Sequence, residues 1–321
     1  MMNYENFKEI VMGKFMDYMP DNYRGMELAI IPVNKANVML DGLIIRGIGK
    51  NTSPIIYVDD MYKEYQDCGN LEQCIMKQCN AMVRALKEMP VVSIDSILKD
   101  AKEKIVFQII NTQLNRARLD KVPHRHFMDI SIIYKIIVNE DQRGIQSVEV
   151  TDEIAGLLGM NEGQLFRCAV ENTKRIFPTT VRSMNEVLKD MCLYNGVPDD
   201  DIGMILDERM ADQAMWVISN TTCNNGAANM LYENVLHELA EKLGSNLYIL
   251  PSSVHEVIAV PTELGGPGEL AELVNQANMQ CVSPTERLSN HVYYYDRDLR
   301  KLTLATDVLE QGDIVLELPL V

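Results

Sequence analysis

Hydrophobic residues recur along this chain with two spacings, one typical of helices and the other of strands. Residues 3–18 and 71–88 carry apolar side chains at every third or fourth position, which predicts two amphipathic helices. Between them lie the apolar runs 27–33 and 37–45, separated by a short link, and this arrangement predicts a β-hairpin. Helices and a hairpin in one stretch indicate an α+β fold.

The same mixture of patterns continues to Pro178, where we place a domain boundary. Residues 127–138 form one long apolar run that predicts a buried strand, and residues 144–150 can pair back on it. A helix is expected over residues 161–175, and it ends shortly before the proline. We therefore expect an N-terminal α+β domain over residues 1–178.

The remaining residues predict a second α+β domain, in which strands and helices alternate regularly. A helix over residues 180–195 is expected first. The elements after it follow the order β-α-β-β-α-β, with bounds at 214–219, 227–243, 247–250, 254–260, 268–278 and 292–295. This order is typical of ferredoxin-like sheets, so we expect a mixed sheet in a C-terminal domain over residues 179–306. Residues 307–321 are expected to form a tail.

The charge of the chain limits the partners it can have. Of its 321 residues, 46 are acidic and 30 are basic, which gives a formal net charge of −16. A surface this acidic repels phosphate backbones and anionic lipid headgroups, so neither nucleic acid nor a membrane is an expected partner. The N-terminus lacks the pattern of a secretory signal peptide, and no apolar run is long enough to cross a membrane.

The seven cysteines are scattered along the chain and their number is odd. This distribution argues against a disulfide framework and indicates a cytoplasmic protein with reduced thiols. Cys68, Cys74 and Cys79 lack the C-x-x-C spacing of metal sites, and on one helix they would point to different sides. We therefore expect no metal at these cysteines.

The segment 248–261 contains the best candidates for catalysis. Ser252 and Ser253 precede His255 and Glu256, and a serine nucleophile needs a histidine base that a further group, such as Glu256, orients. The segment lacks the G-x-S-x-G pattern of serine hydrolases, and strand alternation sends His255 and Glu256 to opposite faces. The alternative is that the serines close a tight turn and that His255 is hydrogen-bonded at the end of a strand.

A second group of residues has the spacing of metal ligands. His124 and His126 alternate on a predicted strand, so both imidazoles lie on one face, and Asp129 follows closely enough to supply a third ligand. Two histidines do not complete a metal site. The alternative is an ion pair between Arg125 and Asp129 at the entry to a buried strand.

A third group of residues is expected to form a binding site. If the strands 254–260 and 292–295 are neighbours, His255 and His291 converge on one pocket beside Tyr293. Asn224 and Asn225 lie where a strand meets a helix N-terminus, a junction that can hold an anion. The alternatives are an ordinary polar rim on a sheet and a capped loop.

Four groups of residues, spread over nearly the whole chain, resemble a known family. They are Pro123-His124-Arg125 with Phe127, Asp129 and Tyr134; Glu171-Asn172-Thr173 with Phe177-Pro178; Leu250-Pro251-Ser252-Ser253 with His255-Glu256-Val257; and Ser283-Pro284 with Glu286 and His291-Val292-Tyr293-Tyr294-Tyr295-Asp296. The chain resembles the bacterial family catalogued as domain of unknown function 5688, met in gut Clostridia such as the Lachnospiraceae. The resemblance implies a cytoplasmic protein of an anaerobe, and it brings no activity, cofactor or catalytic residue.

Because no nucleophile, metal or phosphate motif is complete, the sequence favours a non-catalytic cytoplasmic binding or interaction module. Its partner would be another protein or a small molecule, and no cofactor is expected. The alternatives are a serine-type hydrolase that uses Ser252 or Ser253 with His255, and a metal-binding protein that uses His124 and His126.

Overall fold

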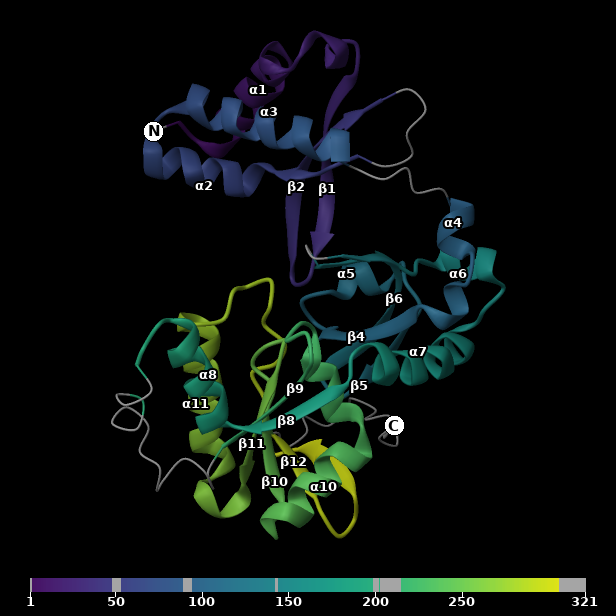
Figure 1. The fold of residues 1–321 in the computed structure, drawn as a ribbon, viewed down its shortest axis with the longest axis vertical. Helices are drawn as coiled ribbons and strands as arrows, with labels where there is room; N and C mark the ends of the chain where they lie inside the picture. The colour runs from purple at the N-terminus through teal and green to yellow at the C-terminus, as the bar shows by residue number, and fades with distance from the viewer. Residues whose placement is uncertain are drawn as a thin grey trace. The chain divides into compact units, whose positions relative to one another are not determined.

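The computed structural model describes residues 2–47, 53–88, 94–141, 144–198, 202 and 215–305. The chain forms two compact units, Met1–Lys99 and Asp100–Val321 (Figure 1). The expected boundary after residue 178 therefore falls inside the second unit. At that point α7 (Glu162–Ile176), which packs on β4 (Ile105–Asn111), continues almost directly into a strand of the next sheet. The expected tail over 307–321 lies outside the described residues.

The first unit is a small α+β domain. Its three-stranded sheet has the order β1-β2-β3, and every pairing in it is antiparallel. Its elements are α1 (Tyr4–Lys14), η1 (Phe15–Tyr18), η2 (Asp21–Tyr23), β1 (Glu27–Lys35), β2 (Val38–Arg46), β3 (Ile56–Tyr57), α2 (Val58–Cys68), α3 (Leu71–Glu88) and α4 (Ile94–Leu98). The predicted hairpin and the predicted helix over 71–88 are confirmed, whereas the prediction missed α2.

Helices α1, α2 and α3 lie on one side of the β1–β2 hairpin (Figure 1). Leu28 pairs with Ile45 and Ile30 with Leu43, so all four side chains point to the face that the helices cover. Phe7 of α1 is fully buried in the same core. Burial of an apolar side chain of this size contributes about 1.5–3 kcal/mol, so this core stabilises the first unit.

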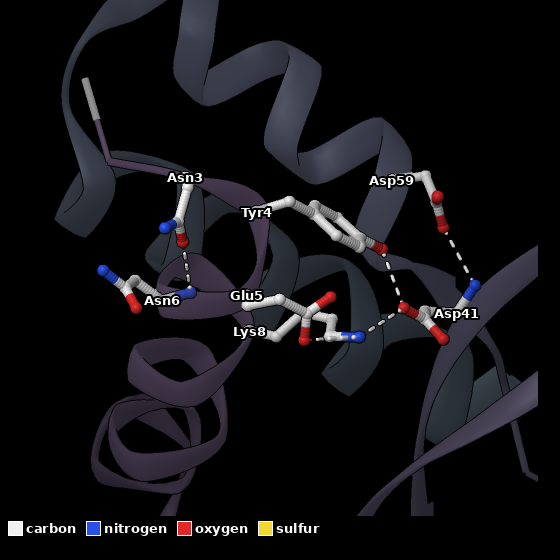
Figure 2. A network of polar contacts seen from close by, with 7 residues as sticks. All are labelled: Asn3, Tyr4, Glu5, Asn6, Lys8, Asp41 and Asp59. Atoms are coloured by element: carbon white, nitrogen blue, oxygen red, sulfur yellow. Dashed lines mark hydrogen bonds and ion pairs between the residues drawn. The ribbon is translucent and has the colours of Figure 1, made fainter.

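A polar network ties α1 and α2 to the same end of β2 (Figure 2). The carboxylate of Asp41 accepts hydrogen bonds from the Tyr4 hydroxyl at 3.0 Å and from the Lys8 ammonium at 2.9 Å. The backbone N–H of Asp41 donates to the carboxylate of Asp59 at 2.9 Å. The contact with Lys8 lowers the pKa of Asp41 from its usual value, so the carboxylate stays charged.

The second unit begins with a four-stranded antiparallel sheet. Strand β6 lies between β4 and β5, and its far half pairs with β7. Its elements are η3 (Ala101–Glu103), β4, α5 (Arg116–Leu119), β5 (His124–Phe127), β6 (Ile130–Asp141), β7 (Gly144–Glu149), α6 (Asp152–Leu158) and α7. The strand predicted over 127–138 begins after a turn at Met128, which has a φ of 54°. This turn separates β5 from β6 and makes them a hairpin.

A six-stranded sheet follows, with the order β13-β12-β10-β11-β9-β8. Its elements are β8 (Thr179–Ser183), α8 (Met184–Tyr194), β9 (Trp216–Asn220), η4 (Gly226–Leu231), α10 (Glu233–Leu243), β10 (Leu247–Leu250), β11 (Val257–Pro261), η5 (Thr262–Leu264), α11 (Pro267–Gln280), β12 (Tyr293–Asp296) and β13 (Lys301–Leu304). The helix predicted over 180–195 is partly wrong, because its first residues form β8.

The order of elements from β9 to β12 is β-α-β-β-α-β, with η4 preceding α10, yet the ferredoxin-like arrangement is not confirmed. Here the hairpin strands β10 and β11 are central among these four strands, whereas in ferredoxin-like sheets the first and third strands are the central pair. The connection from β9 to β10 passes over β11, and the connection from β11 to β12 passes over β10. Strands β9 and β10 therefore run parallel, but β11 lies between them and pairs antiparallel with both. Every pairing between the described strands is therefore antiparallel, and the predicted mixed sheet is wrong.

Helices cover both faces of the six-stranded sheet (Figure 1). Leu270 and Val274 of α11 pack on Leu250 and Val260 on one face. Helix α10 covers the other face, where its Lys242 lies over the ring of Trp216. Among the described residues, no helix is long and apolar enough to cross a membrane. Helices and antiparallel sheets in both units confirm the α+β fold class.

Candidate functional site

Two loops of the second unit lie against each other and contain five of the residues singled out from the sequence, Ser252, Ser253, His255, Glu256 and His291. One joins β10 to β11, and the other precedes β12. The amide of Ser289 donates to the carbonyl of Pro251 at 2.9 Å, and the amide of Val254 donates to the carbonyl of Glu286 at 2.9 Å. Two of the residue groups that resemble the known family are thus paired through their backbones.

The serine and histidine side chains are already engaged. The hydroxyl of Ser253 accepts the backbone N–H of His255 at 3.0 Å, and Ser253 is only 5% exposed. Nδ1 of His255 accepts the N–H of Asn225 at 3.3 Å, while Nε2 lies 3.5 Å from the carboxylate of Glu286. Because a backbone N–H can only donate, the ring proton lies on Nε2. The imidazole is therefore left without a free basic nitrogen for a serine proton.

Ser252 and Glu256 complete the segment. Ser252 is half-buried, and its carbonyl accepts the amide of Leu288 at 3.0 Å. Glu256 is half-buried, and this burial raises the pKa of its carboxyl, against the opposing effects of His255 and Ser253. Within the part of the chain that is described, no hydrogen bond joins either serine hydroxyl to the imidazole.

The loop with Asn224 and Asn225 is held by its own polar groups. The amide oxygen of Asn220 accepts the backbone N–H groups of Thr222 and Asn224, at 3.0 and 3.3 Å. The side chain of Asn225 donates to that of Asn224 at 2.9 Å and accepts a hydrogen bond from Gln108 of β4. These N–H groups are therefore occupied rather than available to an anion, and a 3₁₀ helix, η4, follows the loop.

Gly226 shows how closely this loop is packed. A Cβ at this position would lie 2.2 Å from the hydroxyl oxygen of Ser219 and 2.6 Å from the carbonyl oxygen of His255. Both distances are far inside van der Waals contact, so a side chain here would move the loop. The position requires glycine because of this close approach.

Asp129 and Tyr293 meet in the structure, although the sequence suggested separate roles for them. The carboxylate of Asp129 accepts hydrogen bonds from the hydroxyls of Tyr293 and Ser289, the latter at 2.7 Å. Burial, followed by the charge of Asp129, raises the pKa of the fully buried Tyr293 well above its usual value. His291 lies nearby, and its amide donates to Ser289. Since β10 separates β11 from β12, these strands do not bring His255 and His291 together.

The two histidines of β5 lie together without a third ligand. The rings of His124 and His126 are edge-on, with centroids 4.8 Å apart. Nδ1 of His124 lies 2.9 Å from the carbonyl oxygen of Val122, and Nδ1 of His126 lies 3.0 Å from the hydroxyl of Ser131. Asp129 is engaged elsewhere. Across the described ranges, no group of three or more histidine, cysteine or acidic side chains is placed to hold a metal ion.

Arg125 pairs with Glu162 of α7 rather than with Asp129. Its guanidinium donates two hydrogen bonds to the Glu162 carboxylate, at 2.9 and 2.8 Å, and stacks on the ring of Phe166 at 3.8 Å. The hydroxyl of Tyr134 donates to the same carboxylate. The expected ion pair with Asp129 is therefore wrong, and Arg125 fixes α7 on the four-stranded sheet.

Comparison with known proteins identifies the family. The model of a family of unknown function, DUF5688, matches residues 4–297. The chain belongs to this family. No curated protein and no solved structure matches it. DUF5688 membership extends over both units, so the fold described above is that of a DUF5688 protein.

A pocket that the sequence analysis missed lies between β8, β9, α10 and the end of α7. It has a volume of about 420 Å³ and is open to solvent. Trp216 of β9 forms part of its wall, together with Val235 and Leu239 of α10. Lys174 of α7 and Lys242 of α10 also line it. This DUF5688 protein therefore has an open hollow with a mixed polar and apolar lining that includes two lysines.

Trp216, one of the lining residues, carries a hydrogen-bond donor without a partner in the described chain. Trp216 is only 7% exposed, and its Nε1, which solvent does not reach, has no partner among the described residues. A buried donor without an acceptor costs about 1–3 kcal/mol, so such groups are uncommon in folded proteins. The indole N–H is one of seven buried side-chain polar atoms of the described residues that have no hydrogen-bond partner, and it belongs to a residue that lines the pocket.

The two lysines give the pocket a local positive charge in a strongly acidic protein. The Lys242 ammonium lies 4.0 Å from the centroid of the Trp216 ring, and that of Lys174 lies 6.0 Å from the centroid of Tyr232. Neither ammonium forms a hydrogen bond or an ion pair within the described ranges. Glu238 lies at the same border, and Glu186 is close enough to sense the charge of Lys242.

The sequence held one signal for this pocket. Trp216 is the single tryptophan of the chain, and it lies in the strand predicted over 214–219. The lysines carried no signal, because Lys174 and Lys242 lie on helices that are far apart along the chain.

We expect Asp129→Asn to destabilise the protein, because the amide cannot accept both buried hydroxyls. The free energy of unfolding should fall by about 2 kcal/mol in urea titrations, the usual effect of losing a buried hydrogen bond to a charged group. The matched control is Asp120→Asn on the exposed end of α5, which should change stability by less than about 0.5 kcal/mol. Equal effects of the two substitutions would contradict the structural role of Asp129.

We expect Glu256→Gln to stabilise the protein near neutral pH. Burial raises the pKa of Glu256 in the folded state, so ionisation costs more there than in the unfolded chain. The penalty is present at neutral pH and vanishes below about pH 4, where both states are protonated. Thermal unfolding at the two pH values measures this difference, with Glu238→Gln on the exposed side of α10 as control. A lower melting temperature for Glu256→Gln near neutral pH would refute the expectation.

Proposed function

We propose that this protein is a non-catalytic binding module whose ligand is a small organic anion held in the pocket beside Trp216. The proposal rests on one observation: Trp216, whose buried N–H has no acceptor among the described residues, lines a pocket that Lys174 and Lys242 also line. An anionic oxygen would accept the indole hydrogen bond and offset the positive charge of the lysines.

The lining of the pocket also indicates the rest of the ligand. Val235 and Leu239 supply apolar surface, and the indole ring supplies an aromatic face. Small-molecule sites are typically apolar hollows of this size range with a few polar groups that orient the ligand. The ligand class that fits is a carboxylate or phosphate with an apolar or aromatic body.

Binding without catalysis is supported by the state of the other candidate residues. Ser253, His255 and Asp129 are all engaged in hydrogen bonds that hold the loops of the second unit. A nucleophile needs a base within reach, and a metal needs further ligands. The hydrolase and metal hypotheses therefore have less support than a binding role.

The fluorescence of Trp216 is a direct probe of the pocket, because the chain has no other tryptophan. We expect benzoate, phenyl phosphate or hexanoate at millimolar concentration to change this emission in a saturable way. The neutral analogue benzamide should have a weaker effect than benzoate. Lys242→Gln should weaken binding about ten-fold, since a charge-assisted contact contributes on the order of 1.5 kcal/mol.

Two control variants make this titration decisive. Lys242→Arg keeps the positive charge and should largely retain binding, whereas Lys87→Gln removes an equal charge from the first unit and should change nothing. If none of the three anions gives a saturable change, or if benzamide binds as well as benzoate, the proposal is wrong.

A further inference from the structure

Two cysteines of the first unit meet at the corner between α2 and α3, although the sequence indicated that they point apart. Cys68 is the last residue of α2, and Cys74 lies in the first turns of α3. Their sulfur atoms are 3.3 Å apart. The two cysteines do not share one helix, because the chain turns back between them at Gly69, which has a φ of 68°.

The corner is held by short-range contacts that keep the two sulfur atoms together. The backbone N–H of Asn70 lies 3.4 Å from the Cys68 sulfur, and the carbonyl of Asn70 accepts the amide of Cys74 at 3.2 Å. The side-chain oxygen of Asn70 accepts the amide of Gln73 at 3.1 Å. Asn70 therefore fixes the start of α3 relative to Cys68.

The two thiols differ in their access to solvent. Cys68 is exposed, whereas Cys74 is only 1% exposed. Burial, together with the contact with Cys68, raises the pKa of the Cys74 thiol to about 12. An oxidant in solvent therefore reacts first with Cys68, and the buried Cys74 can supply the second sulfur of a disulfide.

We infer that Cys68 and Cys74 form a reversible disulfide when the protein meets hydrogen peroxide. A disulfide bond is about 2.05 Å long, so the sulfurs must approach by about 1.2 Å, from 3.3 Å. This inference concerns the first unit and is independent of the pocket beside Trp216.

The chemistry balances in two steps. The Cys68 thiolate attacks one peroxide oxygen, so an S–O bond forms, the O–O bond breaks, and the hydroxide that leaves takes up a proton as water. The Cys74 sulfur then attacks the sulfur of the Cys68 sulfenic acid, so the S–S bond forms and the S–O bond breaks. The hydroxyl group leaves with the Cys74 proton as a second water. Two sulfurs lose two electrons, and peroxide gains them.

Peptide mass spectrometry can test this inference on the full-length protein. Trypsin cleaves after Lys63 and Lys77, so one peptide, 64–77, contains both cysteines. After treatment with one equivalent of hydrogen peroxide and alkylation of free thiols, we expect this peptide to be lighter by two hydrogens and unalkylated. Reduction should restore two alkylation sites. Cleavage after Glu72 should leave two fragments joined by the disulfide.

Three cysteine variants supply the controls. Cys68→Ser removes an exposed thiol and should abolish the disulfide without unfolding the protein. Cys74→Ser should leave Cys68 as a sulfenic acid that dimedone traps. Cys223→Ser removes another exposed thiol and should leave disulfide formation in peptide 64–77 unchanged. Oxidation of Cys68 to sulfinic or sulfonic acid in the unmodified protein, with Cys74 still a free thiol, would overturn the inference.

Discussion

The carboxylate of Asp129 joins the two sheets of the second unit, and the loops around it depend on that contact. Asp129 lies in the turn between β5 and β6, and its carboxylate accepts hydrogen bonds from the hydroxyls of Tyr293 and Ser289. Both hydroxyl side chains are almost fully buried, so the carboxylate satisfies donors that water does not reach. Because the loop of Ser289 pairs with that of Ser253 and His255, one charge positions both loops.

This arrangement engages residues that look catalytic in hydrogen bonds within the fold. Ser253 and His255 are neighbours along the chain, yet the serine hydroxyl bonds to the histidine backbone and not to its ring. The ring instead accepts a hydrogen bond from the backbone N–H of Asn225. The side chain of Asn225 in turn accepts a hydrogen bond from Gln108 of the other sheet. In contrast, the Trp216 N–H has no acceptor in the described chain. Trp216 also lines the pocket, and the proposed ligand is assigned there for that reason.

Much of the fold could be predicted from the sequence, because the apolar spacing of several elements is strong. The hairpin of β1 and β2 and the helix α3 were predicted nearly to their bounds. The misses have local causes. A left-handed residue at Met128 splits one apolar run into two strands, and α2 was missed altogether. The sheet order was not predictable from element order, since two interleaved crossovers give the same series as a ferredoxin-like sheet.

The candidate site was less predictable, because its parts come from distant segments. The rarity of tryptophan draws attention to Trp216, but the sequence does not place Lys174 and Lys242 beside it. The sequence singled out Arg125 and Asp129, but it did not show which residues their side chains contact. Arg125 bonds to Glu162 of α7, which sequence spacing cannot reveal. Tertiary contacts decide which polar residues are structural and which are available to a ligand.

The most direct test of the account is the NMR signal of the Trp216 indole N–H, which is the single tryptophan signal of the protein. If an anion accepts this hydrogen, saturation with benzoate will shift the indole proton downfield, and benzylamine, its cationic counterpart, will leave it in place. In the Lys242→Gln variant the shift should need more benzoate. An indole signal that is unchanged at saturating benzoate, or that moves equally with benzylamine, would contradict the account.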